Sequence, residues 1–330
     1  MKYRILVVED IDSIRRAIVE LLESRYLVSE AENYNHAVDV LNSEKIDLVI
    51  TDIKMPGKSG LELIVYIREK FPNILYSLIT AYDINQYIHF AKDYNVWNII
   101  PKYSSLDLRY IEVMVEKLLG RDIFGIEKYY PDLVIKTDSI NTGFELPPEN
   151  GFIYKIVKSD EERNKICERV GKFMEGKGAP TSIHQILEEL TSNAMIRAPR
   201  DTKGNAKYQF ELPDSDILVP HKKVRLSEND YFQIGYGFYN NVFLLVTRDY
   251  FGTLKKEEII FRLDRNISDD PSLGFPPGIT DSHGRGLFIC REMADQMIFN
   301  IHKNRQTEVI AILENFDVKP FKSLSIFEVD

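Results

Sequence analysis

The chain has 330 residues, of which 44% are hydrophobic and 28% are charged, and its formal net charge at pH 7 is −9. This length and composition are typical of a soluble protein with two domains of ordinary size, and the negative charge argues against broad attraction to DNA or to an anionic membrane. No stretch approaches 18 consecutive apolar residues, and the two cysteines, Cys167 and Cys290, lack the spacing of metal ligands. We therefore expect a cytoplasmic protein with neither a membrane span nor a signal peptide.

The first 120 residues alternate short apolar runs with amphipathic segments. The apolar runs predict five strands and the amphipathic segments predict five helices, the first of them capped by Asp12 or Ser13. Five βα units in this order predict a doubly wound parallel sheet with helices on both faces. The expected strands are 5–8, 27–31, 48–51, 75–80 and 97–100, and the expected helices cover 14–22, 37–41, 61–71, 84–94 and 106–119.

The pattern loosens after residue 120. Residues 121–150 contain several glycines and prolines, and we interpret them as a linker with one short strand. Residues 151–330 predict a second domain of α+β type, whose first helix is opened by the capping motif Ser159–Glu162. Its expected strands are 152–157, 232–239, 242–247, 297–302 and 308–313, and its expected helices are 160–174, 182–197 and 287–296.

Polar side chains follow the strands of the first domain. Glu9 and Asp10 follow the first strand, Asp52 the third, Thr80 the fourth and Lys102 the fifth. Functional groups gather at the carboxyl ends of the strands in a doubly wound sheet, and three carboxylates brought together there call for a cation such as Mg²⁺. A carboxylate beside Mg²⁺ can attack a phosphoryl group to give an acyl phosphate, whose oxygens the hydroxyl and the ammonium group can meet.

This set of residues resembles the receiver domain of two-component signalling, of the chemotaxis-regulator type, which has a (βα)5 flavodoxin-like fold. The segment from Asp52 to Gly57, with Gly60 after it, closely matches the phosphorylation loop of that family. The resemblance covers residues 1–120 and implies phosphorylation by an upstream histidine kinase or phosphotransfer protein. By position it makes Asp52 the phosphoacceptor, Asp10, Asp52 and the Lys54 carbonyl the Mg²⁺ ligands with Glu9 in support, and Thr80 and Lys102 the switch residues.

Two positions depart from the usual pattern of receiver domains. Pro101 precedes Lys102, where the family usually has lysine followed by proline, and Ile99 stands where the family usually has Tyr or Phe. We expect phosphorylation to survive both changes, and we expect the signal to leave the site by a route other than the usual rotation of an aromatic side chain.

Three short motifs mark the second domain. Glu189 and Asn193 are four residues apart on an expected helix and therefore share one face, where the amide oxygen can coordinate Mg²⁺ and the carboxylate can activate a water. Asp249 follows an expected strand, where an acid can accept the exocyclic amine of adenine. The segment 283–288 places two glycines before an apolar helix, whose N–H groups and dipole favour phosphate. Each motif taken singly also fits a polar helix face or a turn.

Together the three motifs resemble the N, G1 and G2 boxes of the GHKL ATP-binding fold, an α+β sandwich, and look closest to the anti-sigma-factor serine kinases. The resemblance covers residues 151–330 and implies bound Mg-ATP under a lid formed by residues 264–283. By position it makes Asn193 the Mg²⁺ ligand, Glu189 the base, Asp249 the adenine acceptor, Gly252, Gly284 and Gly286 the glycines of the nucleotide loops, and Thr307 a neighbour of the adenine.

The G1 box departs from that family, because Phe251 and Thr253 stand at its two usual glycine positions. Whether the second domain is an enzyme therefore stays open between a protein kinase acting on Ser or Thr of a partner and a nucleotide-dependent switch that sequesters a partner without phosphate transfer. A hybrid histidine kinase is a further alternative. It would need an acceptor such as His184, but residues 121–180 contain no paired amphipathic helices to carry one.

The expected mechanism begins with phosphorylation of Asp52, which shifts the face formed by the fourth and fifth βα units and so changes nucleotide affinity or partner access. The downstream partner is expected to be a protein, as for anti-sigma proteins, and a homodimer formed through the receiver is compatible with the sequence. A DNA-binding output is disfavoured, because no helix-turn-helix pattern follows the receiver.

Overall fold

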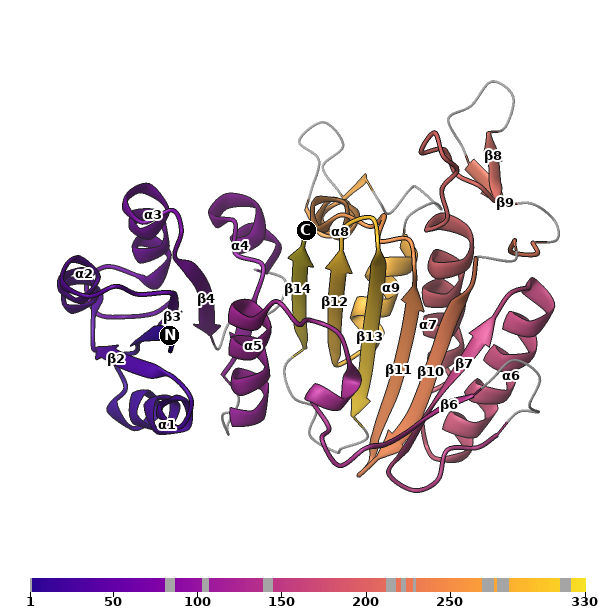
Figure 1. Ribbon diagram of the computed structural model, residues 1–330, viewed down its shortest axis with the longest axis horizontal. Helices are drawn as coiled ribbons and strands as arrows, with labels where there is room; N and C mark the ends of the chain where they lie inside the picture. The colour runs from indigo at the N-terminus through magenta and orange to yellow at the C-terminus, as the bar shows by residue number, and fades with distance from the viewer. Residues whose placement is uncertain are drawn as a thin grey trace. The chain divides into compact units, whose positions relative to one another are not determined.

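The computed structural model describes residues 2–80, 87–102, 107–138, 145–211, 218–220, 224–227, 230–268, 276–277, 285–314 and 322–330. The chain forms two compact units, whose elements are labelled in Figure 1. The first unit comprises residues 1–123 with 321–327, and the second comprises residues 124–320 with 328–330.

The first unit is built on five parallel strands in the order β2-β1-β3-β4-β5. This order confirms the doubly wound, flavodoxin-like fold expected from the alternating pattern. The strands are β1 (Arg4–Val8), β2 (Leu27–Ala31), β3 (Leu48–Asp52), β4 (Leu75–Thr80) and β5 (Ile99–Pro101). The helices are α1 (Asp12–Glu23), α2 (Tyr34–Ser43), α3 (Gly60–Lys70), α4 (Tyr87–Tyr94) and α5 (Leu108–Gly120).

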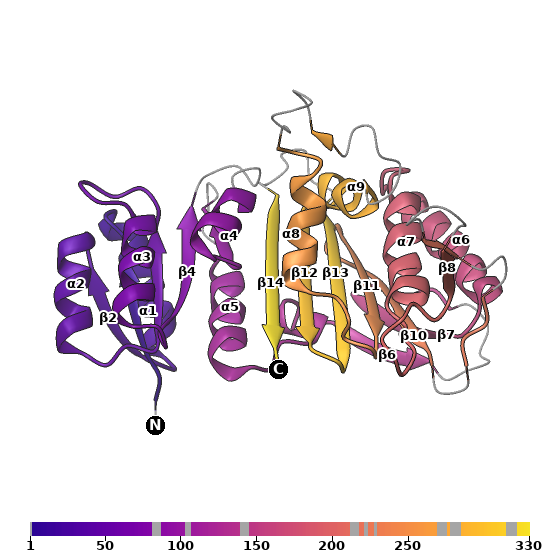
Figure 2. The same ribbon diagram turned by 90° about the horizontal axis from the view of Figure 1, so that it is seen from above.

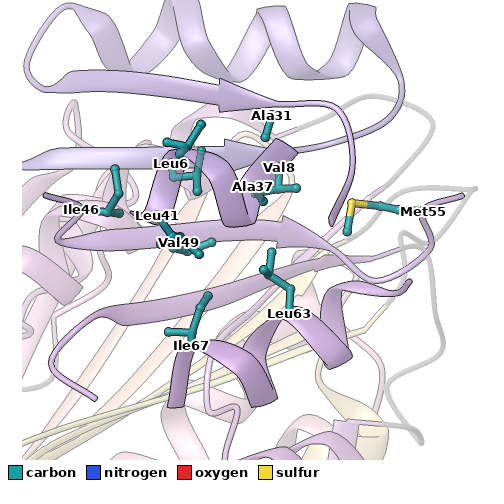
Figure 3. Packing of buried hydrophobic residues seen from close by; sticks show 11 residues of the cluster. Leu6, Val8, Ala31, Ala37, Leu41, Ile46, Val49, Met55, Leu63 and Ile67 are labelled. Atoms are coloured by element: carbon teal, nitrogen blue, oxygen red, sulfur yellow. The ribbon is translucent and has the colours of Figure 1, made fainter. Parts of the chain in front are cut away.

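The core of the first unit lies on both faces of its sheet. On one face, Leu6 and Val49 from the strands meet Leu41 of α2 and Leu63 of α3 (Figure 3). The intervening residues of β1 are also fully buried, because alternate side chains point to opposite faces and helices cover both. Burial of one such side chain stabilises the fold by about 1.5–3 kcal/mol.

The start of α1 differs from the expectation. Ile11, and neither Asp12 nor Ser13, occupies the N-cap position, and its side chain makes no capping hydrogen bond. The Asp12 carboxylate instead forms ion pairs with Arg15 and Arg16 one turn later. The expected cap was wrong because this carboxylate has partners within the helix that the spacing of apolar residues does not reveal.

The second unit contains a mixed sheet in which β12, β13, β11, β10, β7 and β6 follow one another in that order. Its pairings are antiparallel except for the parallel pair of β6 and β7. The bounds are β6 (Val134–Asp138), β7 (Gly151–Val157), β10 (Phe232–Tyr239), β11 (Val242–Asp249), β12 (Gln296–His302) and β13 (Gln306–Glu314). Two short strands, β8 (Gln209–Glu211) and β9 (Leu218–Pro220), pair separately, and β14 (Ser323–Val329) groups with the first unit as far as Phe327.

The helices of the second unit gather on one side of this sheet (Figure 2). They are α6 (Asp160–Gly176), α7 (Ile183–Ser192), α8 (Lys256–Asp264) and α9 (Arg285–Met293). A π-helical turn, η3 (Asn193–Arg197), continues α7, so the single helix expected over 182–197 changes its winding at Asn193. Helix α8 was not predicted from the sequence, because only three residues in its nine-residue span, Ile259, Ile260 and Leu263, are buried. None of the described helices is long and apolar enough to cross a membrane.

The segment expected to be a linker belongs largely to the second unit, which begins at Phe124. Its expected strand is present as β6 and extends the sheet beside β7. Before β6 the short 3-10 helix η2 (Ile126–Lys128) buries Ile126 completely. The glycines and prolines of this stretch predicted a linker with one short strand, and the structure adds that β6 and the buried Ile126 are part of the second unit.

Candidate functional site

Three acids and one lysine meet at the carboxyl ends of the strands in the first unit. Glu9 and Asp10 directly follow β1, and Asp52 is the last residue of β3. Each offers a carboxylate oxygen within 4.8 Å of those of the other two. The Nζ atom of Lys102, just after β5, lies 2.7 Å from Oε2 of Glu9 and 2.7 Å from Oδ2 of Asp52. The structure thus brings together four of the residues that the sequence singled out.

Burial sets the electrostatics of this cluster. Glu9 is fully buried and Asp52 is 5% exposed. Burial raises the pKa of Glu9, and the hydrogen bond and positive charge of Lys102 act in the opposite direction. Burial lowers the pKa of Lys102, but its hydrogen bonds to Asp52 and Glu9 outweigh that effect and raise the pKa above its usual value. Lys102 therefore stays protonated and holds the two buried carboxylates together.

The ends of β4 and β5 position the remaining side chains. Thr80 is the last residue of β4 and is 4% exposed. Its carbonyl oxygen accepts a hydrogen bond of 2.7 Å from the backbone N–H of Lys102. The two candidate switch residues, Thr80 and Lys102, are therefore neighbours at the ends of adjacent strands. Ile99, where an aromatic residue is usual, is a buried aliphatic side chain at the start of β5. Residues 81 and 103 lie outside the described parts of the chain.

Gly60 lets α3 begin directly against the end of β3. A Cβ atom at this position would lie 1.9 Å from the Asp52 carbonyl oxygen and 2.8 Å from Oγ1 of Thr51. The preceding Ser59 caps α3 through a reciprocal capping box with Glu62. Backbone packing and helix capping therefore fix the loop that follows Asp52.

The acid cluster fits a divalent metal ion. Three ionised carboxylates and one ammonium group sum to −3 + 1 = −2, which one divalent cation would balance. Mg²⁺ prefers oxygen ligands and usually takes one or two protein carboxylates, with water and phosphate completing its shell. Receiver domains bind Mg²⁺ at an acidic pocket of this kind. The role of the Lys54 carbonyl stays a prediction.

A pocket in the second unit contains several of the other predicted residues. Asn193 comes from the start of η3, Asp249 from the end of β11 and Thr307 from β13. Asp249 and Thr307 are directly paired across the two strands. The full lining is Leu190, Asn193, Ala194, Arg197, Ala198, Arg200, Thr247, Asp249, Thr253, Leu254, Glu258, Arg262, Leu287, Phe299, Thr307 and Val309.

Asp249 is the buried acid of this pocket. Burial raises its pKa to about 6, although hydrogen bonds from the backbone N–H groups of Phe251 and Gly252 lower it. Those N–H groups lie 3.0 Å and 3.3 Å from Oδ1 of Asp249. Gly252 makes the turn possible, because its φ is +60° and a Cβ atom would lie 2.1 Å from the carbonyl oxygen of His302. Hydrogen bonds from Thr307 also lower the pKa of Asp249, and Asp249 lines the pocket.

Glu189 and Asn193 contact each other one helical turn apart. The Asn193 side-chain NH₂ donates to Oε1 of Glu189 at 3.0 Å, and Nη1 of Arg197 lies 3.4 Å from the same oxygen. Oδ1 of Asn193 is buried and has no hydrogen-bond partner among the described residues. A Cβ atom on Gly286 would lie 1.8 Å from Oε2 of Glu189, so the start of α9 approaches this pair as bare backbone. Gly284 and most of the expected lid over 264–283 lie outside the described residues.

The arginines of this pocket were not among the residues predicted from the sequence. Arg197 and Arg200 follow Asn193 closely in the chain, and this proximity could have identified them as pocket residues. Arg262 comes from helix α8, which was not expected. His184, considered as a phosphoacceptor, lies outside the pocket lining, and its Nε2 is 3.2 Å from Oε2 of Glu175 on α6.

The family profile described as response regulator receiver domain matches residues 5–110. The chain is 30% identical over 120 residues to sporulation initiation phosphotransferase F of Bacillus subtilis, an alignment that covers 32% of this chain and 97% of that protein. It is 33% identical over 229 residues to a cyclic di-GMP phosphodiesterase of Thermotoga maritima, covering 66% of this chain and 59% of that protein. The chain thus spans less than two thirds of the phosphodiesterase.

Among solved structures, the response regulator protein TrrA of Thermotoga maritima, in complex with Mg²⁺ and BeF, is 37% identical. That match covers 35% of this chain and 98% of the other, with a TM-score of 0.31. The family match spans the strands that carry the acid cluster and Lys102. The chain therefore belongs to the response regulator family of two-component signalling and carries its receiver domain at the N-terminus.

Proposed function

We propose that Asp52 accepts phosphate from an upstream histidine kinase or phosphotransfer protein and that this modification controls nucleotide-dependent output from the second unit. The acid cluster with Lys102 supports the first half of the proposal. The pocket lined by Asn193, Asp249 and Thr307 supports the second half and is the observation that carries it.

At the receiver site, an Asp52 carboxylate oxygen attacks phosphorus, the bond from phosphorus to the donor nitrogen breaks, and an acyl phosphate forms. A Mg²⁺ ion bound by Asp10, Asp52 and the Lys54 carbonyl, with Glu9 in support, would neutralise charge on the phosphoryl oxygens. Lys102 already lies 2.7 Å from Asp52 and needs only a small movement to reach a phosphoryl oxygen. The Thr80 hydroxyl, at the end of the adjacent strand, is proposed to meet another.

In the second unit we propose a GHKL-like ATP site. Asp249 accepts the exocyclic amine of adenine, with Thr307 beside it, and the unpartnered Oδ1 of Asn193 is available to a Mg²⁺ ion carried by the nucleotide. The arginines of the pocket supply positive charge for phosphate. Gly252 and Gly286 are proposed to leave backbone close to the ligand.

The output of this site is proposed to be either transfer of phosphate to Ser or Thr of a partner protein or a partner switch without transfer. Glu189 is the candidate base, and its carboxylate is engaged by Asn193 and Arg197. The side chain of Thr253, at a position where the related fold has glycine, donates to the carbonyl of Ala198. This departure from the glycine pattern of the G1 box favours the switch over the kinase.

Calorimetric titration of the full chain with Mg-ATP tests the proposal. We expect saturable binding that Asp249→Asn weakens by about fivefold or more, since a mispaired buried polar group costs about 1–3 kcal/mol. Exposed Asp201→Asn, in the same unit, is the matched control. Absence of binding by the unmodified chain would refute the nucleotide site. Labelled phosphate appearing on a partner protein, and lost in Glu189→Gln, would decide for the kinase.

A second candidate output is hydrolysis of cyclic di-GMP, the activity named for the Thermotoga relative. It is favoured by one observation, since an alignment over 66% of the chain must extend beyond the receiver. Metal-assisted phosphodiester hydrolysis needs clustered metal ligands, and among the described residues the cluster Glu9, Asp10 and Asp52 is the only such group of three or more acids, histidines or cysteines. We expect no linear product from cyclic di-GMP, and its formation would overturn the ATP proposal.

A further inference from the structure

The sheet of the second unit carries a buried charged network on the face opposite the pocket. Successive side chains of a strand point to opposite faces. Thr247 and Asp249 line the pocket, so Arg248 between them points to the other side. On β13, Thr307 lines the pocket and its neighbour Glu308, paired with Arg248 in the register, points away from it.

Glu308 is the centre of this network. It is fully buried, and its Oε2 accepts from Nε and Nη2 of Arg248 at 3.0 Å and 2.5 Å. The other oxygen, Oε1, accepts at 2.9 Å from the side chain of Asn300 and at 2.9 Å from the backbone N–H of Gly125. The guanidinium group of Arg248 also lies over the ring of Tyr154, 4.7 Å from its centroid. Both carboxylate oxygens are thereby used.

The bond to Gly125 ties a separate segment to the sheet. Residues 124–130, which we call the strap, cross the strands on the side away from α7 and α9 (Figure 1). Gly125 has a φ of +106°, the next residue, Ile126, is fully buried, and the ring of Tyr130 lies 5.3 Å from that of Tyr239. The strap is also the first part of the second unit after α5, the last helix of the receiver, which ends at Gly120.

A buried ion pair is a costly way to anchor a strap, because apolar side chains of similar volume would hold it at least as firmly. What the ion pair adds is a fixed, directional link between the strap and the two strands that form the pocket. A single peptide unit joins Arg248 to Asp249, and another joins Glu308 to Thr307. A ligand that shifts or stiffens the pocket side of these strands therefore acts on the network at the other side.

We infer that Glu308 is a latch that couples docking of the strap to occupancy of the pocket. By latch we mean the hydrogen bond by which Glu308 holds the strap at Gly125. The coupling rests on the proposed nucleotide site, whereas the latch does not. Because coupling between two sites is reciprocal, a displacement of the strap from the receiver side changes ligand affinity, and a bound ligand holds the strap more firmly.

Amide hydrogen exchange on the full chain, with and without Mg-ATP, tests both parts. We expect the amides of the strap to exchange about tenfold faster in Glu308→Gln, as loss of one buried hydrogen bond predicts. Mg-ATP should slow them in the unmodified chain and have a smaller effect in the variant. Glu314→Gln, on the same strand but outside the network, is the matched control. Exchange of the amides of β10, which lies outside the network, separates loss of the latch from loss of the fold.

Unchanged strap exchange in Glu308→Gln would overturn the latch, whether or not nucleotide binds. If calorimetry shows Mg-ATP binding while strap exchange in the unmodified chain stays the same, the coupling is refuted and the nucleotide site survives. If Mg-ATP does not bind, the nucleotide site and its coupling fail together, and faster strap exchange in Glu308→Gln with unchanged exchange in β10 still supports the latch.

Discussion

Glu9 and Asp249 are buried acids that serve different purposes. Glu9 shares one lysine with Asp52, so its charge is balanced by a partner that phosphorylation would draw away. Asp249 accepts hydrogen bonds from backbone N–H groups of the turn that follows β11, and it lines the pocket. Burial raises the pKa of both carboxyl groups. The two acids differ in their neighbours, which are a lysine side chain for Glu9 and backbone N–H groups for Asp249.

For Glu9 we predict that burial of its carboxylate lowers the free energy of unfolding of the receiver as the pH rises. Its folded-state pKa lies above the ordinary value of 4.5, so the folded state binds this proton more tightly than the unfolded state. The stabilising contribution is complete below pH 4.5 and is lost as the pH rises through the raised value. Glu9→Gln should remove this loss, because glutamine does not titrate.

Urea unfolding followed by fluorescence of Trp97, the single tryptophan and a receiver residue, measures the effect across pH 4–7. The exposed Glu20→Gln on α1 is the control. Added Mg²⁺ should restore stability at neutral pH in the unmodified chain, by the mass-action effect of a ligand that binds the folded state. An identical pH profile for Glu9→Gln and the unmodified chain would contradict the prediction.

For Asp249 we predict that nucleotide affinity rises with pH. The carboxylate form accepts the amine of adenine better than the protonated form, and the pKa is raised to about 6 by burial. Mg-ATP binding measured by calorimetry should therefore strengthen between pH 5 and pH 7. Asp249→Asn should lose this dependence, and the difference between the two profiles removes the titration of the nucleotide's own phosphates. Parallel profiles would show that Asp249 does not contact the base.

At the scale of elements, the junction of β3 and α3 depends on Gly60. We predict that Gly60→Ala destabilises the receiver by about 1–3 kcal/mol, the usual range for overpacking, because the new methyl group collides with the Asp52 carbonyl. Gly120→Ala at the end of α5 has open space around the added Cβ and is the matched control. Its stability should stay unchanged or rise. Trp97 fluorescence measures both, and equal stabilities would refute the role of close packing at Gly60.

The sequence predicted elements best where periodicity and burial agree. The receiver strands and the antiparallel pair of β12 and β13 lie within two residues of their expected ends. Most of these strands contain a continuous buried run, whereas β2 is mostly exposed or half-buried. Helix α8 escaped prediction because its buried face is short and its start is charged. The π-helical turn at Asn193 could not be predicted, since it depends on tertiary packing of the end of α7 and leaves no periodic signal.

Some residues of the candidate sites could be predicted from the sequence and others could not. Residues at strand ends, such as Asp52 and Asp249, were found because topology alone places strand ends together. The network on the other face of the second sheet was not found, because its central contact, between Arg248 and Glu308, joins residues 60 positions apart. Arg262 likewise reaches the pocket from a helix that no motif marks.

At the scale of the whole molecule, the boundary between the two units lies near the start of the expected linker. Residues 121–150 look like a passive connection in sequence, but the second unit begins at Phe124 and includes the strap. The distance along the chain between the last receiver helix and the first anchored residue of the second unit is therefore short. A short connection transmits a change in the receiver more directly than a flexible one would.

Phosphorylation of the receiver should therefore change nucleotide binding by the second unit. We predict that acetyl phosphate with Mg²⁺ alters the affinity of the full chain for Mg-ATP by about fivefold or more, the lower end of ordinary allosteric coupling. Asp52→Asn should abolish the change without altering basal affinity, and the exposed Asp39→Asn on α2 should retain it. Glu308→Gln should reduce the change if the strap carries the signal, because the latch would no longer join the strap to β13. Equal affinities with and without acetyl phosphate, in a chain whose Asp52 is shown by mass to be phosphorylated, would mean that the receiver acts on partner binding and not on the pocket.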